Sequence, residues 1–406
     1  MTYQFIEGSV TAAKGFKASG VHCGIRKNKD KRDLALIVCE KPCTAAAVYT
    51  KNLVQSSPIT VTKKHLENGI AQAVIVNSGN ANTCNADGVE KAEAMCRLVE
   101  EKTGIKSENV IVGSTGVIGQ ILPIEPIADG MNALVDGLSV DGATYAAEAI
   151  MTTDTIKKEV AVETVIGGKT VRIGGISKGS GMIHPNMATM LCFVTTDAAI
   201  SAEMIALAVK EAADCTFNMV SIDGDTSTND TFAVMASGLA DNVEITEKNE
   251  DYMAFVEALT AVSRTLSRMM AKDGEGATKL LVCKVSGAKT LADARGVSKS
   301  VICSSLLKAA MFGSDANWGR VLCAIGYSGC DVDVHKVDVA FASKAGRVDV
   351  CKNGAGIEFS EDLAKTVLTE NEIDILVELN DGTAYAEAYG CDLTYDYVKI
   401  NGDYRS

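Results

Sequence analysis

The sequence has few aromatic and proline residues and no long apolar run. Of its 406 residues, 5% are aromatic and 5 are proline, whereas 36 are glycine and 47% are hydrophobic. The core must therefore consist mainly of aliphatic side chains, packed in layers of sheet and helix that tight glycine turns connect. The longest apolar stretches, such as residues 34–39 and 73–76, are far shorter than the roughly 20 residues of a membrane-spanning helix, so we expect no transmembrane segment.

Basic residues are also fewer than acidic residues. The chain has 39 Lys and Arg against 52 Asp and Glu, a net charge of −13. This balance disfavours nucleic acid or an anionic membrane as a partner and favours a small molecule. Residues 1–10 lack the basic segment and apolar block of a secretory signal, so we expect a cytoplasmic protein.

The sequence lacks the spacings of a metal site or a disulfide framework. None of its 13 cysteines forms a CxxC pair, and its 4 histidines lie far apart. Several cysteines, such as Cys192 and Cys323, lie inside apolar runs, where a free thiol behaves as a small hydrophobic side chain. We therefore expect reduced core thiols and no bound metal.

Hydrophobic patterning predicts a mixed α/β protein built from layers of strands and helices. Gly167-Gly168 predicts a hairpin over residues 160–173, and Asp381-Gly382 predicts another between strands at 373–380 and 384–389. The other expected strands cover residues 34–39, 46–50, 59–61, 73–77, 110–112, 191–195 and 279–284. Helices are expected at about residues 89–102, after the N-cap residue Ser201, at 252–272 and at 306–311.

A glycine-rich polar segment, residues 178–191, leads to Thr189 at the mouth of an apolar strand. A threonine hydroxyl needs a base, and cleavage of the preceding peptide bond would supply one, because the freed α-amine has a pKa near 8. Ala188 is small and would not obstruct attack of the Thr189 hydroxyl on its carbonyl. The alternative is a purely structural Thr189, since threonine is favoured in strands. His184 is a second candidate base, and its alternative role is to stabilise a turn.

Residues 113–119 form another glycine-rich segment, which follows the expected strand at 110–112. Its backbone N–H groups suit either an oxyanion or a phosphate. It contains neither GxGxxG nor the Lys-Ser/Thr of a P-loop, so a plain turn between elements is an equal alternative.

Together these segments resemble the ornithine acetyltransferase (ArgJ) family over essentially the whole chain, in order. The resemblance rests on the string at residues 178–191 with its Ala188-Thr189 junction and on residues 113–119. It also rests on the motifs at residues 76–82, 151–155, 273–279, 314–320 and 401–406.

The resemblance implies a precursor that cleaves itself between Ala188 and Thr189. The products would be an α chain, residues 1–188, and a β chain, residues 189–406, interleaved in one fold and assembled as an α2β2 heterotetramer. The implied fold class is α/β (α+β), an αββα sandwich like that of N-terminal nucleophile hydrolases, with a connectivity shared with the DmpA aminopeptidases.

The resemblance also implies an activity and its residues. Thr189 would carry an acetyl group from N-acetylornithine to glutamate by a ping-pong mechanism, with Thr115 and Gly116 stabilising the oxyanion. The implied substrate-binding residues are Thr152, Lys178, Thr189, Glu275, Asn401 and Ser406. Without the family context, Lys178 and Glu275 would be taken for surface charges.

No cofactor is implied, although acetyl-CoA is a possible co-substrate in bifunctional members of the family. Two other functions stay open. A self-processed amidase or aminopeptidase would pass the acyl group from the same Thr189 to water. A nucleotide-binding or structural protein would use residues 113–119 as a phosphate loop and would remain one uncleaved chain.

Overall fold

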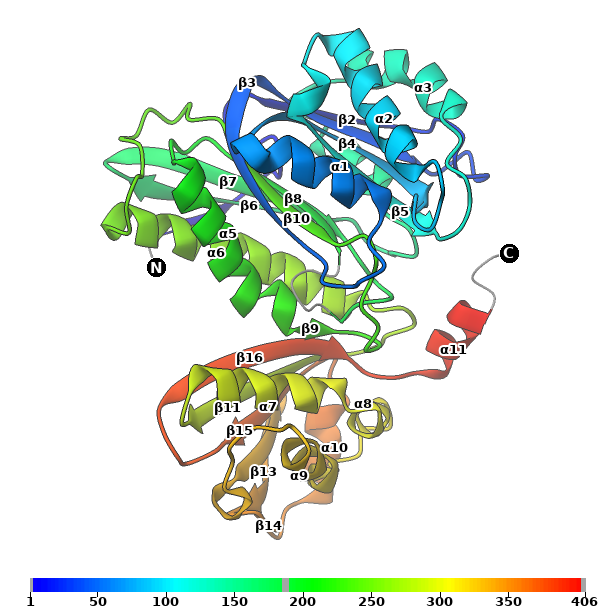
Figure 1. Ribbon diagram of the computed structural model, residues 1–406. Coiled ribbons are helices and arrows are strands. Elements are labelled where there is room, and N and C mark those ends of the chain that lie inside the picture. The colour runs from blue at the N-terminus through cyan, green and yellow to red at the C-terminus, as the bar shows by residue number, and fades with distance from the viewer. Residues whose placement is uncertain (1–2, 185–189, 403–406) are drawn as a thin grey trace. The chain divides into compact units, whose positions relative to one another are not determined.

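The computed structural model describes residues 3–184 and 190–402 (Figure 1). The chain divides into two compact units. The first contains Met1–Gly179, Asn186–Asn218 and Thr226–Leu266, and the second contains Ser180–Pro185, Met219–Asp225 and Ser267–Ser406. Within the described residues, no helix is both long enough and apolar enough to cross a membrane.

The first unit is built on a nine-stranded sheet. Its strands follow the order β1-β6-β7-β8-β10-β3-β4-β5, and β2 pairs with β3 beside this path. The bounds are β1 (Tyr3–Ile6), β2 (Phe16–Val21), β3 (Leu34–Tyr49), β4 (Ile70–Asn80), β5 (Val110–Val117), β6 (Lys158–Ile166), β7 (Lys169–Lys178), β8 (Leu191–Thr196) and β10 (Thr231–Ala236).

The long strand β3 belongs to two halves of this sheet. Its first half pairs with β2 and β4, its second half pairs with β10, and its register with β4 shifts between Val38 and Cys43. The two halves face each other, because a Cβ on Gly113 of β5 would lie 3.4 Å from the ring of Phe193 on β8. Ile37 and Phe193 share the buried cluster between the halves. Truncating a buried Phe such as Phe193 to Ala typically costs about 3–5 kcal/mol.

Helices cover the outer faces of both halves (Figure 1). Alternate β3 residues such as Leu36 point out of the sandwich and pack, with β4 and β5, against α1, α2 and α3. On the other half, α5 contacts β3 and β10, and Leu266 of α6 packs over Gly175 of β7. The bounds are α1 (Ser57–His65), α2 (Gly88–Thr103), α3 (Glu125–Asp136), α5 (Ala202–Cys215) and α6 (Glu250–Lys272), and α4 (Ala143–Ala149) contacts β2 and β3. The expected αββα layering is confirmed.

The second unit has a seven-stranded sheet in the order β14-β13-β12-β15-β11-β16-β9. In β11, Leu281 and Cys283 face the core that the helices cover, whereas Leu280 and Val282 face a smaller cluster around Tyr389. The strand bounds are β9 (Val220–Ser221), β11 (Leu280–Ala288), β12 (Asp338–Ser343), β13 (Gly346–Lys352), β14 (Ala355–Gly356), β15 (Glu372–Glu378) and β16 (Ala384–Cys391). The helices are α7 (Leu291–Cys303), α8 (Ser305–Phe312), α9 (Trp318–Gly326), α10 (Glu361–Leu368) and α11 (Tyr395–Gly402).

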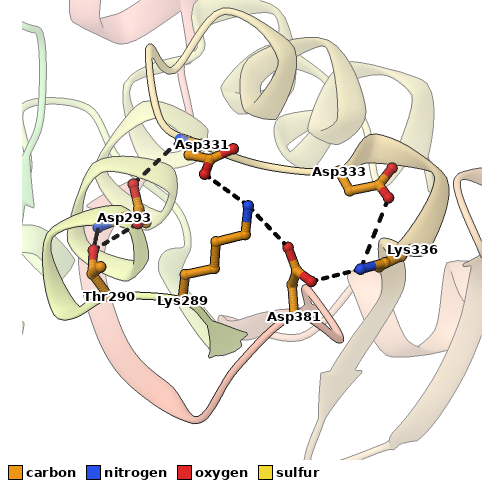
Figure 2. A network of polar contacts seen from close by, with 7 residues as sticks. All are labelled: Lys289, Thr290, Asp293, Asp331, Asp333, Lys336 and Asp381. Atoms are coloured by element: carbon orange, nitrogen blue, oxygen red, sulfur yellow. Dashed lines mark hydrogen bonds and ion pairs between the residues drawn. The ribbon is translucent and has the colours of Figure 1, made fainter.

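An exposed network of charges links three connections of this second unit (Figure 2). The Lys289 ammonium lies 2.7 Å from Asp331 and 3.3 Å from Asp381, and Lys336 lies 2.6 Å from the other oxygen of Asp381. Hydrogen bonds from these lysines lower the pKa of Asp381. Because solvent screens such pairs, the network orients the β15–β16 connection more than it stabilises the fold.

Two expectations about local structure are wrong. Residues 59–61 belong to helix α1, because Pro58 occupies its first turn and overrides the strand preference of Ile59 and Val61. Strands β15 and β16 do not form a hairpin, since β11 lies between them, parallel to β15 and antiparallel to β16. A strand as apolar as β11 is most stable in the middle of a sheet, and sequence neighbours do not reveal that insertion.

The other expected elements are confirmed. Gly167 and Gly168 have φ angles of 54° and 74°, and Ile166 pairs with Lys169 across this two-residue turn. The Ser201 hydroxyl caps α5 by accepting from the Met204 N–H. The strands expected at 34–39 and 46–50 are parts of one strand, β3, and the other expected strands overlap β4, β5, β8 and β11. The remaining helices match α2, α6 and α8.

Candidate active site

The end of β5 carries Thr115 and Gly116, and Gly116 has a backbone conformation that side chains rarely adopt. Gly116 pairs with Gly79 of the parallel strand β4, where the register becomes irregular. Its φ is +131°, and a Cβ there would lie 2.3 Å from the carbonyl carbon of Gly79. Such irregular pairing interrupts the regular ladder beside the two residues predicted to stabilise the oxyanion.

Asp154 hydrogen-bonds to the backbone at or next to two of the predicted substrate-binding residues, Thr152 and Lys178. Its carboxylate accepts the N–H of Thr152 at 3.0 Å and the N–H of Gly179, next to Lys178, at 2.7 Å. It also pairs with the buried Lys158 at 2.7 Å. Thr152 and Lys178, which lie 26 residues apart, are therefore anchored to one carboxylate.

Two buried carboxyls interact with Lys178, and their pKa values are shifted in opposite directions. Burial would raise the pKa of Asp154, but the nearby Lys158 and Lys178 ammonium groups lower it to about 2. The pKa of Asp230 is raised well above its usual value because its burial outweighs the attraction of Lys178. Near neutral pH, Asp154 is the ionised partner of Lys178, whereas the environment of Asp230 favours a proton.

Arg26 connects this carboxylate region to the end of β5. Its guanidinium donates to the carbonyls of Met151 at 2.8 Å and Thr152 at 3.2 Å. Its side chain packs against Gly79, the partner of Gly116, because a Cβ on Gly79 would lie 2.9 Å from the Arg26 Cγ. The first unit thus brings its four predicted and described site residues into one region: Thr115, Gly116, Thr152 and Lys178.

In the second unit, Glu275 and Asn401 are in direct contact. The Asn401 amide donates to the Glu275 carboxylate at 2.7 Å, and the Glu275 N–H donates to the Ser180 carbonyl at 2.8 Å. Glu275 is buried, with 7% of its surface exposed. Gly181 has no room for a side chain, since a Cβ would lie 2.4 Å from the Glu275 carboxylate.

The chain segment after Gly181 is held by Asp223 and includes His184. The Asp223 carboxylate accepts the N–H groups of Met182 at 2.6 Å and Ile183 at 2.9 Å. Burial, together with the nearby Lys299 ammonium, lowers the pKa of His184 to about 4, so its imidazole is neutral at pH 7. Its Nδ1 lies 3.1 Å from the Ser221 hydroxyl. This contact suits either role that the sequence allows for His184.

Ala188, Thr189 and Ser406 lie outside the described residues. Met190, the residue after Thr189, is described, and its carbonyl accepts the Thr231 N–H at 2.8 Å. From there β8 runs between β7 and β10, so the two strands that follow residue 188, β8 and β10, lie between β7 and β3, which precede it. Among the described residues, no three His, Cys, Asp or Glu side chains are grouped so that they could hold a metal ion.

Sequence reasoning missed Asp154, Asp230 and Arg26 as members of this region. Asp154 lies inside the quoted motif at residues 151–155, so its position was a usable signal. Arg26 is more than 120 residues from the carbonyls that it binds, and no pattern in the sequence marks that contact.

The model of the ArgJ family matches residues 17–406. The arginine biosynthesis bifunctional protein ArgJ of Caldanaerobacter subterraneus subsp. tengcongensis is 49% identical over 404 residues, which are 99% of this chain and 100% of the relative. The protein of the same name from Symbiobacterium thermophilum is 50% identical over 405 residues, again 99% and 100% of the two chains. The crystal structure of arginine biosynthesis bifunctional protein argJ from Bacillus halodurans is 43% identical with a TM-score of 0.49, and covers 52% of this chain and 97% of that one.

Proposed function

Because this chain belongs to the ArgJ family, we propose that it is a cytoplasmic acetyltransferase of arginine biosynthesis, which moves the acetyl group of N2-acetylornithine to glutamate. The observation that carries the proposal is the identity of 49–50% to proteins named for this pathway, over 99% of the chain. A solved relative that is 36% identical is named ornithine acetyltransferase and is complexed with ornithine.

Self-cleavage is the first step of the proposed mechanism. The Thr189 hydroxyl attacks the Ala188 carbonyl, and the peptide C–N bond breaks, which leaves the Thr189 α-amine free with the hydroxyl proton. Water then hydrolyses the ester between Ala188 and Thr189, which releases the Ala188 carboxylate and restores the Thr189 hydroxyl. The products are the α chain, residues 1–188, and the β chain, residues 189–406. In the sheet, β8 and β10 of the β chain lie between β7 and β3 of the α chain, and this pairing would hold the two chains together. We propose that they assemble as an α2β2 heterotetramer.

Acetyl transfer follows in two half-reactions. Thr189 Oγ, deprotonated by its own α-amine, attacks the acetamide carbonyl, and ornithine leaves with that proton on its α-amine. The acetyl-Thr189 ester is then attacked by the α-amine of glutamate, which becomes N-acetylglutamate and restores the hydroxyl. Thr115 and Gly116 would stabilise the oxyanion in both halves, where losing one donor typically costs a factor of about 10² to 10³ in turnover.

The proposed substrate contacts combine charged and neutral groups. The substrate amino acids offer carboxylates and amines, which suit a buried ammonium and a buried carboxylate. These contacts are Thr152, Lys178, Thr189, Glu275, Asn401 and Ser406. No cofactor is needed, and acetyl-CoA would serve as a second acetyl donor, in line with the word bifunctional in the names of the relatives.

The test is Thr189→Ala compared with Thr195→Ala, a matched change on β8 that removes a hydroxyl donating to the Val10 carbonyl. Denaturing mass spectrometry should find two fragments in the parent protein and in Thr195→Ala, and one intact chain in Thr189→Ala. Only the cleaved proteins should form N-acetylglutamate from N-acetylornithine and glutamate. A parent protein that stays intact, or that releases acetate at a rate glutamate does not change, would contradict the proposal.

A separate assay tests whether acetyl-CoA serves as the second acetyl donor. N-Acetylglutamate should form from acetyl-CoA and glutamate when N-acetylornithine is absent. If none forms while transfer from N-acetylornithine proceeds, the enzyme has only the transfer activity.

A further inference from the structure

A buried asparagine joins the two halves of the sandwich in the first unit. Asn229 directly precedes Asp230 and β10, and 7% of its surface is exposed. Its Nδ2 donates to the carbonyls of Ala81 at 2.6 Å and Ser114 at 2.8 Å. Since a carbonyl only accepts hydrogen bonds, these two contacts also determine which side of the amide is nitrogen.

The oxygen of the same amide also has two hydrogen-bond partners. Asn229 Oδ1 accepts from the hydroxyls of Thr228 at 2.6 Å and Thr83 at 2.9 Å. The amide therefore uses both of its donors and both acceptor positions. Neither Asp nor Leu can reproduce this pattern, because Asp has no amide donors and Leu has no polar atoms.

These bonds connect the proposed oxyanion site to the strands that follow Thr189. Ser114 precedes Thr115 on β5, and its hydroxyl donates to the Asn77 Oδ1 at 2.6 Å. β10, which follows Asn229, is the parallel neighbour of β8, with Thr231 opposite Leu191. Asn229 lies two residues before Thr231, as Thr189 lies two residues before Leu191. β5 and β10 belong to opposite halves of the sandwich, so this amide is a polar link between those halves.

We propose that Asn229 is a positioning residue that sets the distance between the oxyanion donors at Thr115 and Gly116 and strand β8, which begins two residues after Thr189 in the sequence. This inference rests on the proposed acetyl transfer. Oxyanion stabilisation requires donors placed to a fraction of an ångström, and a misplacement of about 1 Å can cost a factor of about 10² in rate. Among the described residues, the Asn229 amide hydrogen-bonds to neither Thr115 nor Gly116, so its loss should change the chemical step and not substrate affinity.

The experiment compares Asn229→Asp with Asn242→Asp. Asn242 is a matched control, since it lies in the same unit, is also 7% exposed, and uses its amide on the N–H and carbonyl of Ala199 and the carbonyl of Val243. Both variants should lose thermal stability. Asn229→Asp should lower kcat about 10²-fold with the KM for N-acetylornithine within about twofold, and should slow self-cleavage, whereas Asn242→Asp should keep the parent kcat.

Asn229→Ala is the second variant, for the case that Asn229→Asp does not fold, because a cavity in place of the amide can admit water without introducing a charge. Its single-turnover rate of β-chain acetylation, followed by mass spectrometry, should fall at least tenfold. If an Asn229 variant acetylates and turns over like Asn242→Asp, the inference is wrong while the proposed function stands. If the parent protein and Asn242→Asp transfer no acetyl group, the proposed function fails and the inference fails with it.

Discussion

Replacing Asp154 by Asn tests whether one carboxylate holds this part of the site together. The substitution keeps the size of the side chain and removes the negative charge that faces Lys158 and Lys178. The Lys158 side chain is fully buried, and its ammonium lies 2.7 Å from the carboxylate. A neutral amide at this position could not supply that charge, and its NH2 group would replace one of the two oxygens that accept hydrogen bonds from Thr152, Lys158 and Gly179.

The expected loss of unfolding free energy can be estimated from the pKa of Asp154 and from the burial of its ion pair with Lys158. A pKa lowered from 3.8 to about 2 means that the native surroundings favour the ionised form by roughly 2 kcal/mol. Removing one partner of a buried ion pair costs about 3–5 kcal/mol, because a buried charge loses its counter-charge. We therefore expect Asp154→Asn to lower the free energy of unfolding at pH 7 by about 2–5 kcal/mol.

The same interaction predicts a pH dependence. The pKa of Asp154 is lower in the folded protein than in the unfolded chain, so its stabilisation is complete above about pH 4 and is lost as the pH falls towards 2. The destabilisation of Asp154→Asn relative to the parent protein should therefore shrink as the pH decreases through that range.

Urea unfolding at several pH values measures both effects, and Asp349→Asn is the control. Asp349 is exposed and pairs with Arg347 at 2.7 Å, so its loss should change the free energy of unfolding by less than about 1 kcal/mol. Asp154→Asn should also raise the KM for N-acetylornithine, because the anchor of Thr152 and Gly179 is weakened. An Asp154→Asn protein that unfolds at pH 7 like Asp349→Asn would refute the reasoning.

Three further changes test other parts of the proposed site. Gly116→Ala should lower kcat at least 10²-fold, because a Cβ would lie 2.3 Å from Gly79; steady-state kinetics check this, and normal turnover would contradict it. Glu275→Gln should raise the KM for substrate at least tenfold while circular dichroism stays unchanged, and an unaltered KM would exclude a substrate contact. A chain ending at Ile400 loses the Asn401 contact with Glu275 and should lose transfer activity to glutamate, whereas full activity would show that this segment is dispensable.

Local features of the sequence identified most elements, because their causes lie within a few residues. Gly167-Gly168 supplies the positive φ angles of the β6–β7 turn, and Ser201 supplies its own helix cap. Strand β4 could be predicted from its apolar run, which is buried on both faces. Where two local signals compete, as Pro58 and Ile59 do, strand preference alone gave the wrong element.

Interactions between distant parts of the chain could not be predicted in this way. The insertion of β11 between β15 and β16 depends on which strand gains most from a central position, and that comparison involves the whole sheet. The same limit applies to the site, where Asn229 reaches carbonyls at residues 81 and 114. Buried polar groups are constrained to find partners, but their partners depend on how the layers stack.

The sequence by itself determined the family, because its ordered motifs are properties of the linear chain, and resemblance to that family implied the αββα class and most residues proposed for the chemistry. Only the tertiary structure decided that Asp154 anchors Thr152 beside Lys178, and that Asn229 links the halves of one sandwich. The physical reason is that turns and caps form between neighbours, whereas the pairing of buried charges and amides requires the packed layers that bring distant residues within hydrogen-bond distance.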